Sequence, residues 1–213
     1  MYPGDSMDSP DMKREELIRE VLALEWEMFT NVNSINGRAS CQDDDKTFII
    51  MRKAQADVWS MDTLKSYLLD LKNAKDDKTN LMAIKYARMM EATFPEEYEN
   101  LKEQLPVVSD RSRKLAIEIV KYHLKWSMEA FGKYPKLFSL GRPASGSAGR
   151  SNSIENYLKG ELLTYSEETL GLCLKDTIAA ANNDMNLSLE ILKNTAKSYG
   201  FDSLDAIEEK LSG

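Results

Sequence analysis

The segment SDRSRKLAIEIVKYHLKWSMEAF, residues 109–131, sets the architecture of this chain. From Lys114 onward its charged side chains share one narrow stripe of a helix, and the rest of the segment is mostly apolar. A helix that is apolar over so wide an arc packs against neighbours on several sides. Ser109 is a favourable N-cap, and Gly132 is typical of the residue that follows a helix C-terminus. We therefore predict a long central helix over about 110–131.

Outward from this segment, apolar residues recur with helical periodicity along almost the whole chain. Further helices are predicted over residues 10–29, 43–59, 62–73, 81–93, 95–106, 154–165, 167–183, 187–199 and 203–211. Residues 30–40 and 133–152 are rich in Asn, Ser and Gly, which predicts loops. No alternating strand pattern of any length occurs. We expect an all-α protein, one single-domain multi-helix bundle over 1–213 with about eight to ten helices around the long one, and residues 1–8 flexible.

Composition narrows the class of protein. Of the 213 residues, 42% are hydrophobic and 30% are charged, which is ordinary for one soluble domain. A net charge of −7 argues against a nucleic-acid surface and against adsorption to anionic membranes. No stretch approaches the roughly 20 apolar residues of a membrane helix, and the first residues do not resemble a signal peptide. Cys41 and Cys173 are expected to be free thiols, so the sequence predicts a cytoplasmic protein.

Five polar residues occupy positions that should be apolar. At about 100° per residue, Glu25, Arg52, Gln55, His123 and Glu161 each fall inside an apolar helix stripe. Burying such groups costs roughly 1–3 kcal/mol each unless they are paired or hydrogen-bonded. The sequence therefore predicts a shared polar interior. Either this interior fixes the register of the helices, or it lines a cleft where Arg52 and the glutamates meet a ligand.

The chemistry of these residues suggests roles for them. Glu161 or Glu25 could act as general base or acid, and Arg52 and Gln55 could hold a ligand. His123 is the only histidine, and it is either a general acid or base that orients a ligand or relays a proton, or a neutral core histidine satisfied by a neighbouring side chain or water.

A second group lies between two predicted helices, in GRASCQDD at 37–44. Helix N-termini favour anions and lower the pKa of nearby thiols, so Arg38, Cys41 and Asp44 are candidate ligand-binding residues. The adjacent aspartates oppose activation of the thiol, which favours Cys41 as an ordinary packing or polar-loop residue over a reactive thiolate. The loop containing GRPASGSAGRS, 141–151, lacks the GK[ST] ending of a P-loop and is expected to be a surface loop or a cover over an anionic ligand.

Metal and cofactor templates do not fit. Helical di-iron proteins use Glu-x-x-His pairs on facing helices, whereas the residue three before His123 is Val120. The acidic residues do not match the magnesium motifs of helical isoprenoid synthases. We therefore expect neither a metal nor an organic cofactor.

Several motifs resemble a bacterial family, DUF4125, that is defined only as a domain of unknown function. They are EWEMF at 25–29, GRASCQDD at 37–44, YARMME at 86–91, YPK at 134–136 and YLKGEL at 157–162. The resemblance covers about residues 17–170 and implies no particular activity.

Two functions remain open at the level of sequence. The first is a small-molecule enzyme or ligand binder with an internal Arg/Glu/His pocket for a small anionic metabolite. The second is a non-catalytic interaction protein whose buried polar network is structural and whose protein partner is unknown. Whether the buried charges line a cavity open to solvent separates the two.

Overall fold

Eleven α-helices build the part of the chain that this computed structural model describes, residues 10–33, 37–143 and 153–212. The helices are α1 Pro10–Thr30, α2 Asp45–Ala56, α3 Met61–Asp76, α4 Leu81–Thr93, α5 Pro95–Leu101, α6 Asp110–Lys133, α7 Pro135–Ser139, α8 Ile154–Leu162, α9 Glu167–Asn182, α10 Leu187–Ser198 and α11 Leu204–Ser212. Two short 3₁₀ turns, Ser40–Asp43 and Lys102–Gln104, complete the described elements. The described ranges contain no strand, so the all-α class is confirmed. The expected flexibility of residues 1–8 lies outside the described residues.

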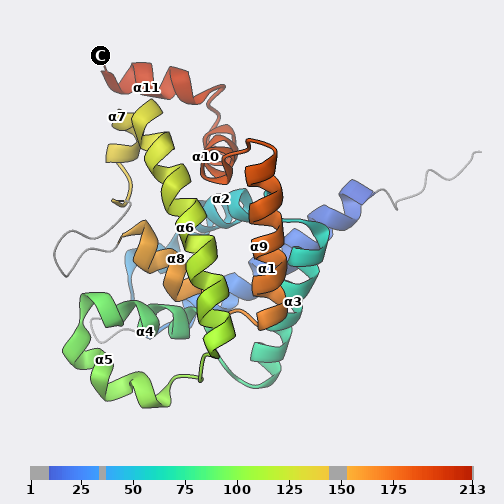
Figure 1. Ribbon diagram of the computed structural model, residues 1–213, viewed down its shortest axis with the longest axis vertical. Helices are drawn as coiled ribbons and strands as arrows, with labels where there is room; N and C mark the ends of the chain where they lie inside the picture. The colour runs from blue at the N-terminus through green and yellow to red at the C-terminus, as the bar shows by residue number, and fades with distance from the viewer. Residues whose placement is uncertain (1–9, 34–36, 144–152, 213) are drawn as a thin grey trace, which may run out of the picture.

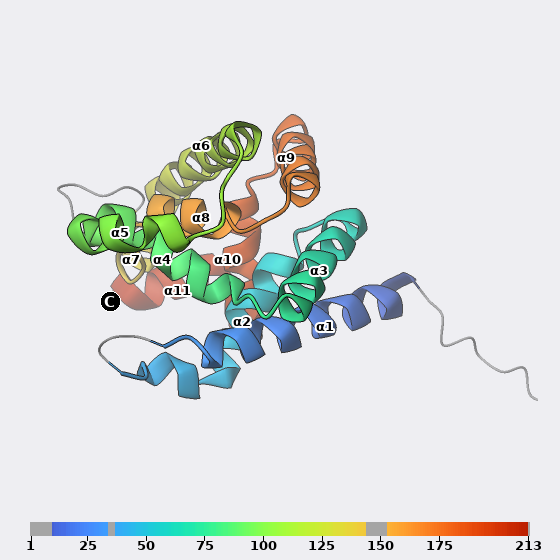
Figure 2. The same ribbon diagram turned by 90° about the horizontal axis from the view of Figure 1, so that it is seen from below.

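The helices stack in layers (Figures 1 and 2). Helices α6 and α9 lie side by side in one outer layer, and α1 and α2 form the opposite one. Between them, α8 packs against α6 and α4, while α10 packs against α6 and α2. The small helices α7 and α11 pair at one end of the molecule. The space enclosed by α2, α6, α8 and α10 is therefore walled by helices from both halves of the chain.

Helix α6 follows the sequence prediction closely. Ser109 caps it by accepting a hydrogen bond from the backbone N–H of Ser112. It packs against α7, α8, α9 and α10, and buries Ala116, Ile119 and other small or apolar side chains. Its opposite face is open to solvent, where Met128 is exposed. The wide apolar arc thus combines a buried face with an exposed one.

The main hydrophobic core lies where α1, α3, α6, α8 and α9 meet. Phe29 stacks on Phe48, with 5.1 Å between ring centroids, which joins the end of α1 to α2. The predicted inner face of α1 is buried as expected, and Glu25 lies within it with 1% of its surface exposed. None of the described helices has an apolar window long enough to cross a membrane.

Two sequence predictions about the end of α6 are wrong. Gly132 does not end the helix, which continues to Lys133. Tyr134 leaves the helical region at φ −130° and ψ 63°, because the following Pro135 disfavours helical geometry in the residue before it. The predicted loop 133–152 is also interrupted, since Pro135 sits in the first turn of α7. Residues 144–152, with most of the glycine-rich sequence, lie outside the described residues.

The region between α1 and α2 differs from its prediction in detail. The loop expected over 30–40 leads into a 3₁₀ turn at Ser40–Asp43, so the three consecutive aspartates do not all begin the helix. Asp44 is the N-cap of α2, and its carboxylate accepts a hydrogen bond from the backbone N–H of Thr47 at 3.0 Å. Helix α2 ends at Ala56, three residues earlier than predicted.

A glycine allows α8 and α4 to approach closely. A Cβ placed on Gly160 would lie 2.7 Å from Cγ of Met89 and 3.1 Å from the carbonyl oxygen of Lys85. Both distances are shorter than ordinary van der Waals contact. Gly160 directly precedes Glu161, so this approach brings the Glu161 carboxylate within reach of Lys85.

Replacing Gly160 with alanine should therefore destabilise the protein. The methyl group must push Met89 aside and move α8 away from the backbone of α4, and such overpacking costs about 1–3 kcal/mol. Gly171→Ala is the matched control, because Gly171 is also helical and has no atom within 4 Å of its added Cβ. That control should raise stability by about 0.5–1 kcal/mol through helix propensity. Urea denaturation measures both; equal gains would show that the close approach imposes no constraint.

Candidate functional site

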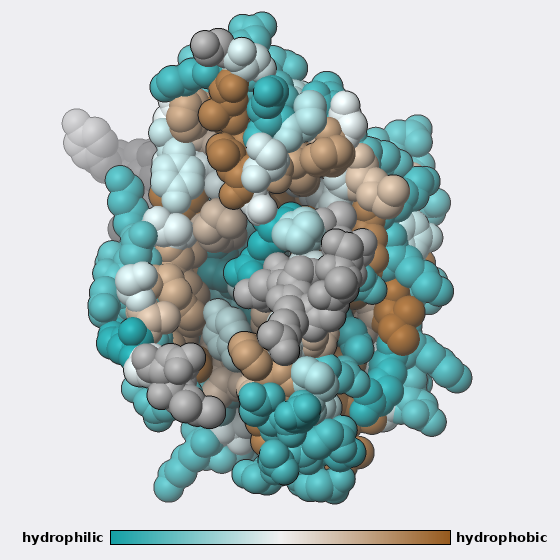
Figure 3. Space-filling model, turned by 90° about the vertical axis from the view of Figure 1, so that its left-hand side faces the viewer, coloured by the Kyte–Doolittle hydropathy of each residue, from teal (hydrophilic) through white to brown (hydrophobic). Residues whose placement is uncertain are grey.

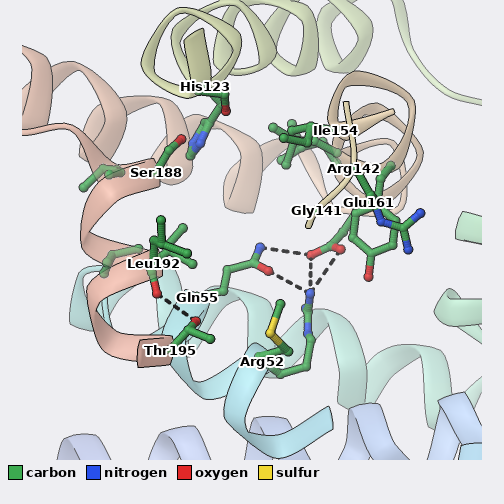
Figure 4. A pocket seen from close by; sticks show the side chains of 18 of the residues that line it. Arg52, Gln55, His123, Gly141, Arg142, Ile154, Glu161, Ser188, Leu192 and Thr195 are labelled. Atoms are coloured by element: carbon green, nitrogen blue, oxygen red, sulfur yellow. Dashed lines mark hydrogen bonds and ion pairs between the residues drawn. The ribbon is translucent and has the colours of Figure 1, made fainter. Parts of the chain in front are cut away.

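Arg52 joins two carboxylates that come from distant parts of the chain. Its Nε donates to Oε2 of Glu25 at 2.8 Å, and its Nη2 donates to the other oxygen of the same carboxylate. Its Nη1 donates to Oε1 of Glu161 at 2.9 Å and to Oε1 of Gln55 at 2.8 Å. The predicted convergence of these four residues is therefore present, and they bring together α1, α2 and α8. Figure 4 shows three of them, Arg52, Gln55 and Glu161.

Tyrosines and a lysine complete this cluster. Tyr67 donates its hydroxyl to Glu25 at 2.8 Å, and Tyr165 donates to Glu161 at 2.8 Å. Lys85 of α4 donates to Oε2 of Glu161 and is 1% exposed. Its ammonium group also lies 3.5 Å from the centre of the Tyr157 ring. Every carboxylate oxygen of the cluster thus accepts at least one hydrogen bond.

Lys85 was missed by the sequence analysis. It lies three residues after Met82 and four before Met89, both buried, so its helical position was a signal of burial. A lysine at such a position is easily taken for a surface residue, because its long stem can carry the ammonium group to solvent. Here the ammonium group points inward, to Glu161.

The charges of the cluster balance. Arg52 and Lys85 carry two positive charges, and Glu25 and Glu161 carry two negative ones. Burial alone would raise the pKa of Glu161, but the charges of Arg52 and Lys85 outweigh it and hold that pKa well below its usual range. The pKa of Arg52 is raised, because the attraction of Glu161 and Glu25 exceeds the effect of burial. Arg52 and Glu161 are therefore both ionised across the physiological pH range.

Beside this cluster lies a cavity of about 620 Å³. Its walls come from α2, α6, α8, α9 and α10, and most of the side chains that line it are apolar, among them Phe48, Trp59, Ile119, Leu158 and Leu192. The face of the molecule in Figure 3 is hollowed near its middle, with apolar side chains on the walls of the hollow. A cavity of this size falls in the range of small-molecule sites, about 300–1,000 Å³.

Most, but not all, of the predicted site residues line this cavity. Those that do are Cys41, Asp44, Arg52, Gln55, His123 and Glu161. Glu25 lies behind Arg52, on the buried face of α1, and does not line the cavity. Arg38 lies away from the cavity and half exposed, where it pairs with Asp43 at 2.9 Å and donates to the carbonyl oxygen of Thr30. A ligand-binding role for Arg38 and a catalytic role for Glu25 therefore have no geometric support.

His123 points from α6 into the cavity (Figure 4). Burial lowers its pKa to about 4, so the imidazole is neutral at physiological pH. The ring contacts Trp126 edge-on, with 5.3 Å between centroids. Within the described residues the imidazole has no hydrogen-bond partner. It is thus neither bonded to the ion-pair cluster nor satisfied by a neighbouring side chain.

The two cysteines differ in their surroundings. Cys41 is exposed at the rim of the cavity, and Cys173 is buried in its wall. Burial raises the pKa of the Cys173 thiol above its ordinary value, so this group stays protonated. In the described ranges, no three His, Cys, Asp or Glu side chains gather closely enough to hold a metal ion.

Removing one charge of the cluster should destabilise the fold strongly. Lys85→Met leaves an excess buried negative charge, and breaking a buried ion pair costs about 3–5 kcal/mol. Lys159→Met is the matched control, because Lys159 and Glu91 form an exposed pair between the same two helices, α8 and α4. That change should cost less than about 1 kcal/mol. Urea denaturation of both variants gives the comparison.

The double variant Lys85→Met/Glu161→Gln tests whether charge balance is the cause. It restores neutrality by leaving Arg52 paired with Glu25. Its loss of stability should be smaller than the sum of the two single losses. Additive losses would contradict the charge-balance explanation.

The titration of His123 gives an independent check on the cavity. As the only histidine, it has one C2 proton resonance, and proton NMR should show a midpoint near pH 4. Because the unfolded chain binds a proton near pH 6.5 and the folded chain does not, stability should fall as pH drops from about 6.5 to 4. His123→Phe should remove this part of the pH dependence. A midpoint near 6.5 would place the imidazole in bulk solvent.

Comparison with known proteins assigns a family and no activity. A search of curated proteins and a search of solved structures each found no match. The family model described as protein of unknown function, DUF4125, matches residues 15–209. This match covers every element that lines the cavity and both carboxylates of the ion-pair cluster. The chain belongs to the DUF4125 family of proteins of unknown function.

Proposed function

We propose that this protein binds a small, largely apolar molecule in the cavity between α2, α6, α8 and α10. The observation that carries the proposal is a cavity of about 620 Å³ with mostly apolar walls and a few polar groups. This composition is typical of ligand sites, in which apolar walls supply affinity and a few polar groups fix orientation. The ion-pair cluster of Glu25, Arg52, Lys85 and Glu161 reaches the wall of the cavity through Arg52 and Glu161.

The contacts of the cluster favour binding over catalysis by a glutamate. A general base works best with a pKa near the working pH, and the pKa of Glu161 lies far below it. The oxygens of Glu161 already accept from Arg52, Lys85 and Tyr165. The sequence suggested that Glu161 or Glu25 acts as general base or acid. Glu25 likewise accepts from Arg52 and Tyr67, so the contacts of neither glutamate support that role.

The same contacts bear on the charge of the ligand. The sequence suggested that Arg38 and Arg52 hold an anionic metabolite. Arg52 is already bound by two carboxylates, so an anion there would have to displace one of them or approach a neutral cluster. In this proposal the buried network fixes the packing of the helices, and the adjoining cavity provides the binding site.

We further propose that the protein is cytoplasmic, because a reducing environment keeps the exposed Cys41 thiol free.

Binding of N-phenyl-1-naphthylamine tests the proposal. This neutral apolar fluorophore brightens when it leaves water, and it should bind the native protein saturably with one site per chain. Leu192→Trp and Ile154→Trp place bulk on two different walls of the cavity, and each should weaken binding at least tenfold (Figure 4). Bound probe should also raise the melting temperature, since a ligand of the native state stabilises it by mass action.

Leu69→Trp is the matched control, because Leu69 is 55% exposed on α3 and lies outside the cavity. Its probe affinity should equal that of the wild type. Non-saturable binding, or binding that both cavity variants leave unchanged, would refute the proposal and favour the non-catalytic interaction protein.

A further inference from the structure

Three polar side chains line one side of the cavity without a partner. They are His123 and Ser127, one turn apart on α6, and Ser188 near the start of α10. None of the three makes a side-chain hydrogen bond with the described residues. Ser127 is only 3% exposed, His123 and Ser188 are half-buried, and burial lowers the pKa of His123 to about 4.

These groups contrast with the other polar residues of the cavity. Gln55 and Glu161 bond to Arg52, Asp176 accepts from Thr63 at 2.7 Å, and Thr177 donates to the carbonyl of Cys173 at 2.7 Å. Among the described residues, the one buried side-chain N or O atom with no hydrogen-bond partner is Nε of Arg88, so the polar atoms of the trio are not sealed off but face the cavity. Their hydrogen-bonding capacity is therefore available to a ligand group. Figure 4 shows His123 and Ser188 across the cavity from Arg52.

The chemistry of the three side chains defines the group that they can bind. A neutral imidazole offers one donor and one acceptor, and each hydroxyl offers a donor and acceptor sites. No charged side chain belongs to this trio. Arg52, on the other side, is already neutralised by two carboxylates, and Arg142, which also lines the cavity, lies with its guanidinium carbon 4.7 Å from the centre of the Tyr157 ring. A full charge placed here would lose its hydration without gaining a counter-ion. A neutral group that both donates and accepts loses little and satisfies all three side chains.

We infer that His123, Ser127 and Ser188 form a recognition subsite for a neutral group that both donates and accepts hydrogen bonds, such as an amide or a hydroxyl, carried by an otherwise apolar ligand. This inference rests on the proposed function and deepens it by naming the class of ligand. The apolar part of the ligand lies along Ile119, Leu158 and Leu192, and its neutral polar group lies under α6.

Three probes of nearly equal shape test the inference. Naphthalene-2-carboxamide carries the neutral polar group, 2-isopropenylnaphthalene replaces it with an apolar one, and naphthalene-2-carboxylate replaces it with an anion. Their affinities are measured by displacement of bound N-phenyl-1-naphthylamine and by calorimetry. The amide should bind at least tenfold more tightly than either of the other two.

Variants locate the preference. His123→Phe keeps a ring against Trp126, while Ser127→Ala and Ser188→Ala remove only a hydroxyl. Each should weaken amide binding about threefold to tenfold, the usual effect of one lost neutral hydrogen bond, and leave the isopropenyl probe unchanged. Thr177→Val is the matched control, because its hydroxyl lines the same cavity but is already bonded to Cys173. It should not change the ratio of the two affinities.

The outcomes separate this inference from the proposed function. Equal affinities for the amide and the isopropenyl probe, both abolished by Leu192→Trp, would overturn the subsite and keep the binding cavity. Tightest binding of the carboxylate would overturn the neutral class in favour of an anion. If no naphthalene probe binds and N-phenyl-1-naphthylamine does not bind either, both the proposed function and the subsite fail.

Discussion

The fold depends on one guanidinium held between two carboxylates. Arg52 is 27 residues from Glu25 and 109 residues from Glu161, and Lys85 adds a fourth helix to the same cluster. Removing these charges from water is costly, and their mutual attraction compensates for it only when every partner is present and well placed. The cluster therefore penalises any arrangement that shifts one of these four helices along another. It fixes a specific packing that apolar contacts alone, which are not directional, leave less sharply defined.

Much of this cluster was visible in the sequence, for a local reason. Polar residues at apolar positions of a helix can be found from a single helix, and this pattern located Glu25, Arg52, Gln55 and Glu161. Their pairing was not readable in the same way, because it depends on how α1, α2 and α8 cross. Lys85 escaped because a lysine beside a buried stripe usually extends to solvent. Only the approach of α8 to α4 at Gly160, a tertiary feature, turns its ammonium group inward.

Helix boundaries show the same division between local and tertiary signals. Caps with a side-chain acceptor were predicted well, as Ser109 of α6 demonstrates. The prediction for Gly132 was wrong because two stop signals competed, and the steric effect of Pro135 on Tyr134 decided where the helix ends. The short helix α7 is stabilised by packing against α11 and not by its own length, since five residues cannot hold a helix alone. Its own sequence, taken without the packing partner, predicts a loop.

The two sides of the cavity have different electrostatic characters, and this difference constrains what the cavity can accept. On the side of α2 and α8, the charges are paired and neutral, so this wall supplies shape and rigidity but few free donors or acceptors. On the side of α6 and α10, His123, Ser127 and Ser188 are uncharged and have no side-chain partner among the described residues, so their hydrogen-bonding capacity is available. A strongly charged ligand would have to disturb the first side or be desolvated at the second. A ligand with an apolar body and one neutral polar group disturbs neither side, because its body meets apolar walls and its polar group meets the unpaired side chains of α6 and α10.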